Sequence, residues 1–117
     1  MNEEYTLNDL RQYAADEYRQ EPTGSYTLNR NGKRIPVTEG VVYITTPAGR
    51  FREDKWCDLA EAAVKREGKE DLYEAIRSHC KAHCPWLRTE KMLRRWALDC
   101  LTGGAYEYWD DFKGVQT

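Results

Sequence analysis

No stretch of this 117-residue chain is apolar over the roughly 20 residues that a membrane-spanning helix needs. The first residues are acidic and hold no apolar segment of the kind found in secretory signals, so we expect a cytoplasmic protein with no membrane partner. The chain also lacks a glycine-rich phosphate loop, a Gly-x-Ser-x-Gly elbow and a His-Glu-x-x-His motif. No spacing of carboxylates marks an acid/base pair. We therefore predict that the protein is not an enzyme.

A strong excess of one charge sign is also missing, since 18 basic residues face 20 acidic ones for a net charge of −2. Residues 1–30 carry six acids and three bases, and residues 96–117 carry four acids and one lysine, so each end sums to −3. Residues 50–95 carry twelve bases and nine acids, or +3. Nucleic-acid-binding domains usually show a larger basic excess. Acidic ends around a mildly basic middle suit recognition of a protein.

The chain does have the composition of a folded protein, with 40% hydrophobic and 32% charged residues. Its length matches one domain that can bury a real core. We find no internal repeat, low-complexity stretch or linker. The sequence predicts a single compact α+β domain over residues 1–117.

The N-terminal part predicts a helix over about residues 7–20. Thr6 and Asp9 have the spacing of a capping box. The apolar positions that follow at helical spacing are Leu7, Leu10, Tyr13, Ala14 and Tyr18. The turn-forming residues 21–24 end this predicted helix.

A β-hairpin is the clearest local signal. Asn31-Gly32 separates residues 25–30 from 33–37, as in a two-residue type I′ turn. The register counted outward from this turn pairs Leu28 with Ile35 and Tyr26 with Val37. Pro36 indicates that the second strand lies at a sheet edge.

Further short strands follow the hairpin. Residues 38–40 predict a turn into a central strand over 41–46, because both faces of that strand are apolar or β-branched. Residues 47–49 predict another turn, with a short return strand over 50–52. The expected sheet is antiparallel and three to four strands wide.

Helical periodicity dominates the rest of the chain, with helices expected at about 54–67, 70–84 and 88–102 and a short aromatic segment at 105–112. We expect the three helices to cover one side of the sheet. The residues assigned to their inner faces are Trp56, Cys57, Ala60, Ala63, Val64, Leu72, Tyr73, Ile76, Cys80, His83 or Cys84, Leu93, Trp96, Ala97, Cys100 and Leu101.

A dense group of potential metal ligands precedes Pro85. The candidate ligands are Cys57, Cys80, Cys84, Cys100, His79 and His83. Zinc takes four nitrogen or sulfur ligands, and one i, i+4 pair plus the two flanking cysteines would supply them. The alternative is that the cysteines are reduced thiols in the core, since all four fall on inward helical positions. We favour the second interpretation and expect no cofactor.

Basic residues offer an alternative function in nucleic-acid binding. The candidates are Arg50, Arg52, Lys55, Arg88, Lys91, Arg94 and Arg95. Together with nearby tryptophans they could follow a phosphate backbone and stack on bases. The same spacing is also that of an ordinary solvated helix face.

Protein recognition is the main hypothesis, because four Trp and eight Tyr exceed what so small a core must bury. The candidate contact residues are Tyr106, Tyr108, Trp109, Asp110 and Asp111 on an acidic side and Arg88, Lys91, Arg94 and Arg95 on a basic side. Residues 105–113 could form an exposed docking segment or pack onto the sheet. We expect stoichiometric binding to a partner protein or nucleoprotein complex. An inhibitor of a host defence, of the kind found among accessory proteins of phages and mobile elements, would be one instance.

Overall fold

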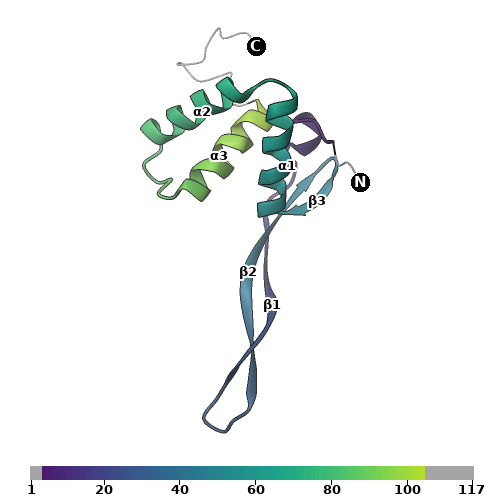
Figure 1. Cartoon of the computed structure of the whole chain (residues 1–117), viewed down its shortest axis with the longest axis vertical. Helices are drawn as coiled ribbons and strands as arrows, with labels where there is room; N and C mark the ends of the chain where they lie inside the picture. Colours follow the sequence, from purple (N-terminus) through teal and green to yellow (C-terminus); the bar gives the residue numbers. More distant parts are fainter. Residues whose placement is uncertain (1–3, 105–117) are drawn as a thin grey trace.

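The structure is a computed structural model that describes residues 4–104. Its elements are the 3-10 turn η1 (Asn8–Leu10), the strands β1 (Glu17–Leu28), β2 (Arg34–Thr46) and β3 (Gly49–Arg52), and the helices α1 (Glu53–Arg66), α2 (Glu70–His83) and α3 (Glu90–Gly103). The molecule is elongated, with extents of 65 × 37 × 22 Å. Most of β1 and β2 extends away from the helices as a long two-stranded ribbon (Figure 1). None of the helices within residues 4–104 combines the length and the apolarity needed to cross a membrane.

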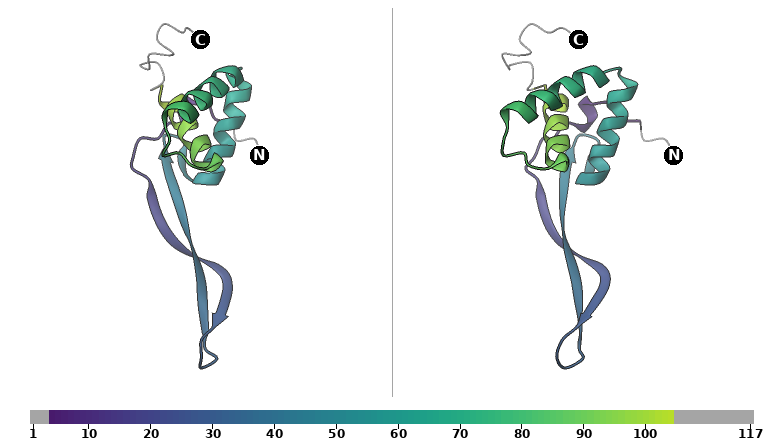
Figure 2. Two further views of the ribbon diagram at one scale, coloured as in Figure 1. Left: turned by 90° about the vertical axis from the view of Figure 1, so that its left-hand side faces the viewer. Right: turned by 60° about the vertical axis from the view of Figure 1, so that its left-hand side comes forward.

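We call the outer part of the ribbon, residues 22–38, the arm. The remaining described residues, 4–21 and 39–104, form the body. The two views in Figure 2 show that the arm extends from the body without a helix beside it. No residue of the arm is buried, whereas the core lies entirely in the body.

The predicted N-terminal helix is wrong beyond its first turn. The capping box does form, because Thr6 and Asp9 exchange hydrogen bonds of 3.0 and 3.1 Å between backbone N–H and side-chain oxygen. The chain then turns extended at Arg11. The indole of Trp56 donates to the carbonyl of Leu10 at 2.8 Å, so that this carbonyl is satisfied by the core and not by a following helical turn. Tertiary contacts thus override the helical spacing.

The sheet has three antiparallel strands in the order β1-β2-β3. The predicted turn at residues 38–40 is wrong, because β2 continues straight through it and pairs with β1 along that stretch. β2 is paired on both sides only at Tyr43, which faces Glu17 of β1 and Arg52 of β3, whereas residues 44–46 pair with β3 alone. Pro36 lies farther out, where β2 pairs with β1 alone, so its strand is open on one side as predicted.

The hairpin at the arm's tip is real, but its turn and register differ from the prediction. The backbone N–H of Gly32 donates to the carbonyl of Asn29 at 3.0 Å, and Gly32 adopts φ +77°. The loop is therefore longer than two residues and resembles a type I turn with a following bulge. The observed pairs are Tyr26 with Pro36, Thr27 with Ile35 and Leu28 with Arg34, a shift of one residue.

A second irregularity, a bulge in β1, lies nearer to the body than the hairpin turn. Pro22 pairs with Thr38 and Tyr26 with Pro36, so three residues of β1 face Val37 alone. Gly24 has φ +86°, a conformation that favours glycine. The hydroxyl of Thr23 donates to the carbonyl of Val37 at 3.1 Å and holds the bulge against β2.

The three helices agree with the predicted ranges, and each ends or begins where the sequence indicates. Thr89 caps α3 by accepting a hydrogen bond from the N–H of Met92 at 3.1 Å. Gly104 follows α3 with φ +75°. The helices do not cover the sheet as expected: α1 supplies the main helix–sheet contact, and α3 packs on α1 and α2.

Most predicted core positions are buried, but Trp96 and the position at His83 or Cys84 are not, since His83 is exposed and Cys84 is half-buried. Trp96 is 41% exposed and not in the core, whereas Leu98 is fully buried and was not predicted. The cluster around Trp56 also includes Leu7 and Leu10 from the N-terminal segment and Ile44 from β2. The core therefore joins the helices to only the inner end of the ribbon.

Candidate functional site

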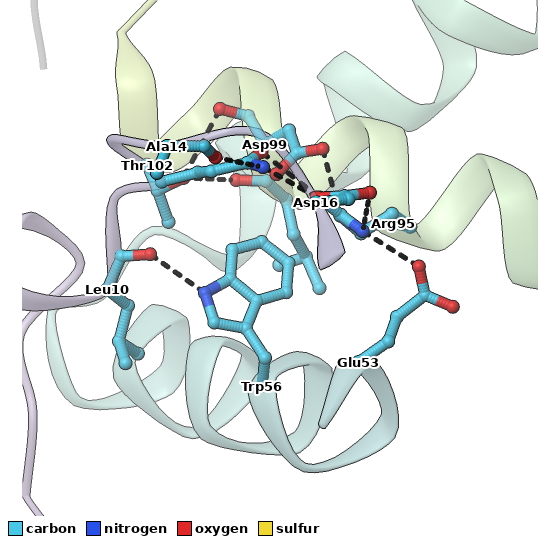
Figure 3. A network of polar contacts seen from close by, with 10 residues as sticks. Leu10, Ala14, Asp16, Glu53, Trp56, Arg95, Asp99 and Thr102 are labelled. Carbon is cyan, nitrogen blue, oxygen red and sulfur yellow. Dashed lines mark hydrogen bonds and ion pairs between the residues drawn. The ribbon is translucent and has the colours of Figure 1, made fainter. Parts of the chain in front are cut away.

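Arg95 of α3 lies inside the body and not on an open basic surface. Its side chain is only 12% exposed and its guanidinium lies 5.3 Å from the ring centre of Trp56. Its hydrogen-bond partners are Gln12 at 3.1 Å, Asp16 at 2.9 Å, Glu53 at 2.7 Å and Asp99 at 2.9 Å. Figure 3 shows how these groups converge from the N-terminal segment, α1 and α3. Arg95 therefore connects three parts of the body.

Asp99 has an unusual position in this network. Burial raises the pKa of its carboxyl to about 6, although the neighbouring Arg95 acts to lower it. One carboxylate oxygen of Asp99, Oδ1, is buried without a hydrogen-bond partner among the described residues. The carboxylates of Asp16 and Glu53 add to the negative charge around it. The network thus holds more acid than its one arginine balances.

Arg94 is also committed to contacts within the body. Its guanidinium contacts Glu61 at 2.5 Å and Asp58 at 2.9 Å. The hydrogen bond from Arg94 lowers the pKa of the Glu61 carboxyl, which also accepts from the hydroxyl of Tyr73 at 2.9 Å. These contacts tie α3 to α1.

The other body residues nominated for nucleic-acid binding differ in whether they have acidic neighbours. Arg50 pairs with Glu17 and Arg52 with Glu21, each at 2.6 Å. Lys91 lies 3.8 Å from Asp54. Exposed positions are held by Lys55 and Arg88. The predicted nucleic-acid surface is therefore largely neutralised by neighbouring carboxylates.

The thiols divide into two environments. Cys80 lies with Cys84 and Cys100 where α2 meets α3, and Cys57 has charged groups of α1 and α3 as its electrostatic neighbours. Burial raises the pKa of Cys57 and Cys100 to about 12 and that of Cys80 to about 11. These three thiols are protonated at neutral pH and poorly nucleophilic.

The two histidines of α2 lie near its end, with ring centres 4.4 Å apart. Within residues 4–104, no group of three or more Cys, His, Asp or Glu side chains is arranged to hold a metal ion. The absence of a cofactor stays an expectation, and zinc binding stays the alternative to it. The predicted acidic and aromatic contact residues, Tyr106, Tyr108, Trp109, Asp110 and Asp111, lie outside the described residues.

Two tryptophans form an apolar surface that the sequence reasoning divided between core and surface. Trp86 and Trp96 meet edge to face with ring centres 6.4 Å apart. Together with Met92 they line an open groove of about 420 Å³. Arg95 and its partners Asp16, Glu53 and Asp99 line the same groove.

The arm was missed as a candidate site. Its exposed apolar residues are Tyr26, Leu28 and Ile35, with exposed fractions of 58%, 68% and 45%. The basic residues at its tip are Arg30, Lys33 and Arg34, all exposed. Residues 22–38 contain no acid at all, and this sequence signal could have identified the arm. The sequence predicted one compact domain, so residues 22–38 were not expected to extend away from it.

Comparison with family models, curated proteins and solved structures finds no match to this chain. Its function is therefore inferred from the described geometry. The two regions offer different possibilities: the body presents a neutralised surface with one tryptophan groove, and the arm presents unburied apolar and basic side chains.

Proposed function

We propose that this protein is a cytoplasmic, non-enzymatic binding protein that acts stoichiometrically on a partner protein or nucleoprotein complex. The arm is the element that reaches the partner. The observation that carries this proposal is a ribbon of residues 22–38 in which no side chain is buried, although it includes large apolar residues. Such residues contribute little to the fold there and gain most from contact with another molecule.

The physical state of a free ribbon supports the same function. An isolated two-stranded hairpin is marginally stable in water, because it has no core on either face. A partner that covers one face would bury Tyr26 and Leu28 and fix the strands in register. Aromatic residues in such positions often carry much of an interface's binding energy.

The body supplies the fixed base for the arm. Arg95 holds the segment just before β1 against α1 and α3 through Asp16 and Glu53. The inner end of β2 enters the core with Ile44, which is fully buried. The arm therefore starts from a rigid anchor, which limits the orientations that it can adopt.

The test compares two matched variants of the full chain. The arm variant carries Tyr26→Ser and Leu28→Ser, and the body variant carries Trp86→Ser and Met92→Ser, so each loses two exposed apolar side chains. Partners are captured from a lysate of the encoding organism, identified by mass spectrometry, and reconstituted for light-scattering measurement of the stoichiometry. We expect a defined complex whose affinity falls at least about tenfold in the arm variant, as loss of about 1.4 kcal/mol implies.

The body variant is expected to keep the wild-type affinity. Circular dichroism and thermal melting of both variants establish that each is folded. Retention of the partner by the arm variant would exclude the arm as the binding element. If wild-type protein forms no complex of defined stoichiometry, the proposed function is wrong.

A further inference from the structure

The charge of the arm differs in sign from that of the rest of the chain. Residues 22–38 carry Arg30, Lys33 and Arg34 and no acid, a charge of +3. Because the whole chain carries −2, the remaining residues sum to −5. None of the three cations has an acidic partner among the described residues, in contrast to the arginines of α3. The tip is a concentrated positive charge far from a negative body.

The register assigns these residues to faces of the ribbon. Residues that pair directly point to the same side, so Leu28 and its partner Arg34 share a face with Tyr26 and its partner Pro36. The guanidinium of Arg34 lies 5.7 Å from the ring centre of Tyr26, which agrees with this assignment. This face, which we call the Tyr26 face, combines one cation with an aromatic ring and aliphatic carbon.

The other two cations lie at the end of the ribbon. Arg30 and Lys33 belong to the loop, which is fixed by the side chain of Asn29: its Oδ1 accepts from the N–H groups of Asn31 and Lys33, both at 2.9 Å. The loop thereby holds its backbone in one conformation while its charged side chains stay in solvent.

We propose that the tip of the arm enters the major groove of duplex DNA, with Arg30, Lys33 and Arg34 against phosphates. This inference rests on the proposed function, and it specifies that the nucleoprotein partner contains duplex DNA. The major groove of B-form DNA is about 12 Å wide and admits a two-stranded ribbon. The deep, narrow major groove of A-form RNA does not. The Tyr26 face lies along one wall of the groove, so that Arg34 reaches the phosphates and Leu28 contacts apolar groups at the base edges.

The charge distribution favours DNA over a protein surface as the occupant. Three cations without acidic neighbours match a regular array of phosphates, and each phosphate contact releases counterions. The negative remainder of the chain is repelled by the same phosphates. A protein with this charge pattern approaches DNA by the tip of its arm and keeps its body away.

The experiment measures fluorescence anisotropy of a labelled 24-base-pair duplex of mixed sequence, titrated with full-length protein. Wild type is expected to bind with a dissociation constant of about 1–100 μM near physiological salt. Three phosphate contacts predict a slope near −2.7 for log affinity against log salt, or about a 40-fold loss between 50 and 200 mM. The tip variant carries Arg30→Gln, Lys33→Gln and Arg34→Gln and is expected to lose at least about tenfold in affinity and most of the salt slope.

The matched control removes three exposed cations from the body, Arg11→Gln, Lys65→Gln and Lys81→Gln, with the same change in net charge. It is expected to bind the duplex within about twofold of wild type at constant salt. Circular dichroism spectra identical to wild type establish that both triple variants are folded.

Three results would overturn the inference. The first is absence of saturable binding by wild type at 200 μM protein and 50 mM salt, and the second is equal loss in the tip variant and the control. The third is equal affinity for a single strand of the same sequence, which would assign the tip to polyanions in general. If duplex binding is absent but a captured protein still depends on Tyr26 and Leu28, the arm contacts a protein and the proposed function stands alone.

Discussion

The body and the arm treat charge and apolar surface in opposite ways. In the body, Arg77, Arg94 and Arg95 each contact at least two carboxylates, and Trp56 is fully buried with its N–H satisfied, although Trp86 and Trp96 stay exposed. In the arm the cations lack acidic partners and large apolar side chains lie in solvent. The body thus pairs these arginines and buries a core, whereas the arm has no buried side chain and its cations have no acidic partner among the described residues.

Because of this difference, the residues that stabilise the fold and the residues proposed to bind a partner lie in different regions of the chain. Burial and ion pairing are confined to the body, so substitutions there act on the free energy of unfolding. Substitutions in the arm remove no buried contact, and under the proposed function they act on binding. We therefore expect substitutions of similar side chains to change the free energy of unfolding in the body and to leave it nearly unchanged in the arm.

The largest effect is expected for Arg95→Gln. Removing the guanidinium leaves Asp16, Glu53 and Asp99 close together, with only the exposed Lys91 at 4.0 Å from Glu53 as a remaining cation. Removing one partner of such a buried ion-pair network costs about 3–5 kcal/mol of stability. Urea denaturation at pH 7 measures the change, and a loss below about 1 kcal/mol would show that the network does not hold the body together.

A smaller loss is expected for Trp56→Phe. Phenylalanine fills much of the space but cannot donate to the carbonyl of Leu10, which would then be buried without its partner. An unsatisfied buried group costs about 1–3 kcal/mol. Chemical denaturation again provides the measurement. Unchanged stability would indicate that the N-terminal segment is not anchored by this hydrogen bond.

The pH dependence of the body is expected to reveal Asp99. Its pKa is raised from 3.8 to about 6 in the folded protein, so the folded state binds the proton more tightly than the unfolded state. This contribution to stability is complete below pH 3.8 and is lost as the pH rises through about 6. The stability of wild type relative to Asp99→Asn should therefore fall over that window, by about 1–2 kcal/mol after allowance for partial exposure. A relative stability that rises over this window would contradict the raised pKa.

The smallest effect on stability is expected in the arm. The variants Tyr26→Ala and Leu28→Ala remove side chains that are mostly exposed, so the free energy of unfolding should change by less than about 0.5 kcal/mol. Thermal and urea denaturation of each single variant test this expectation. A loss of 2 kcal/mol or more would show that these side chains are covered in the free protein, and the contrast between the two regions would fail.

The sequence predicted those parts of the fold that depend on local signals. Helix ranges followed from the periodicity of apolar residues and from stop signals such as Gly68 and Pro85, and the core positions of Ile76 and Cys80 were identified in the same way. The antiparallel hairpin was visible from Asn31-Gly32, although its loop and register were not. The exposed Trp96 was not foreseen, because an apolar residue on the inner stripe gives no indication that its partner, Trp86, is also at the surface.

The candidate site was the least predictable feature. The sequence pointed to basic residues on α3, and only the folded arrangement shows that Arg94 and Arg95 are occupied by carboxylates from α1 and the N-terminal segment. Those partners are 33 to 79 residues away in the chain, beyond the reach of any spacing rule. The absence of acids from residues 22–38 was present in the sequence, but its meaning depended on knowing that this segment leaves the body.

By itself the sequence determined an α+β chain with three amphipathic helices and a hairpin, because these properties depend on residue order over a few turns or strands. Tertiary structure alone decided that residues 11–16 are not helical, that β1 and β2 run on as an arm, and which cations remain without a carboxylate. The physical reason is that hydrogen bonds such as Trp56 to Leu10, and ion pairs between distant segments, compete with local preference and here prevail over it.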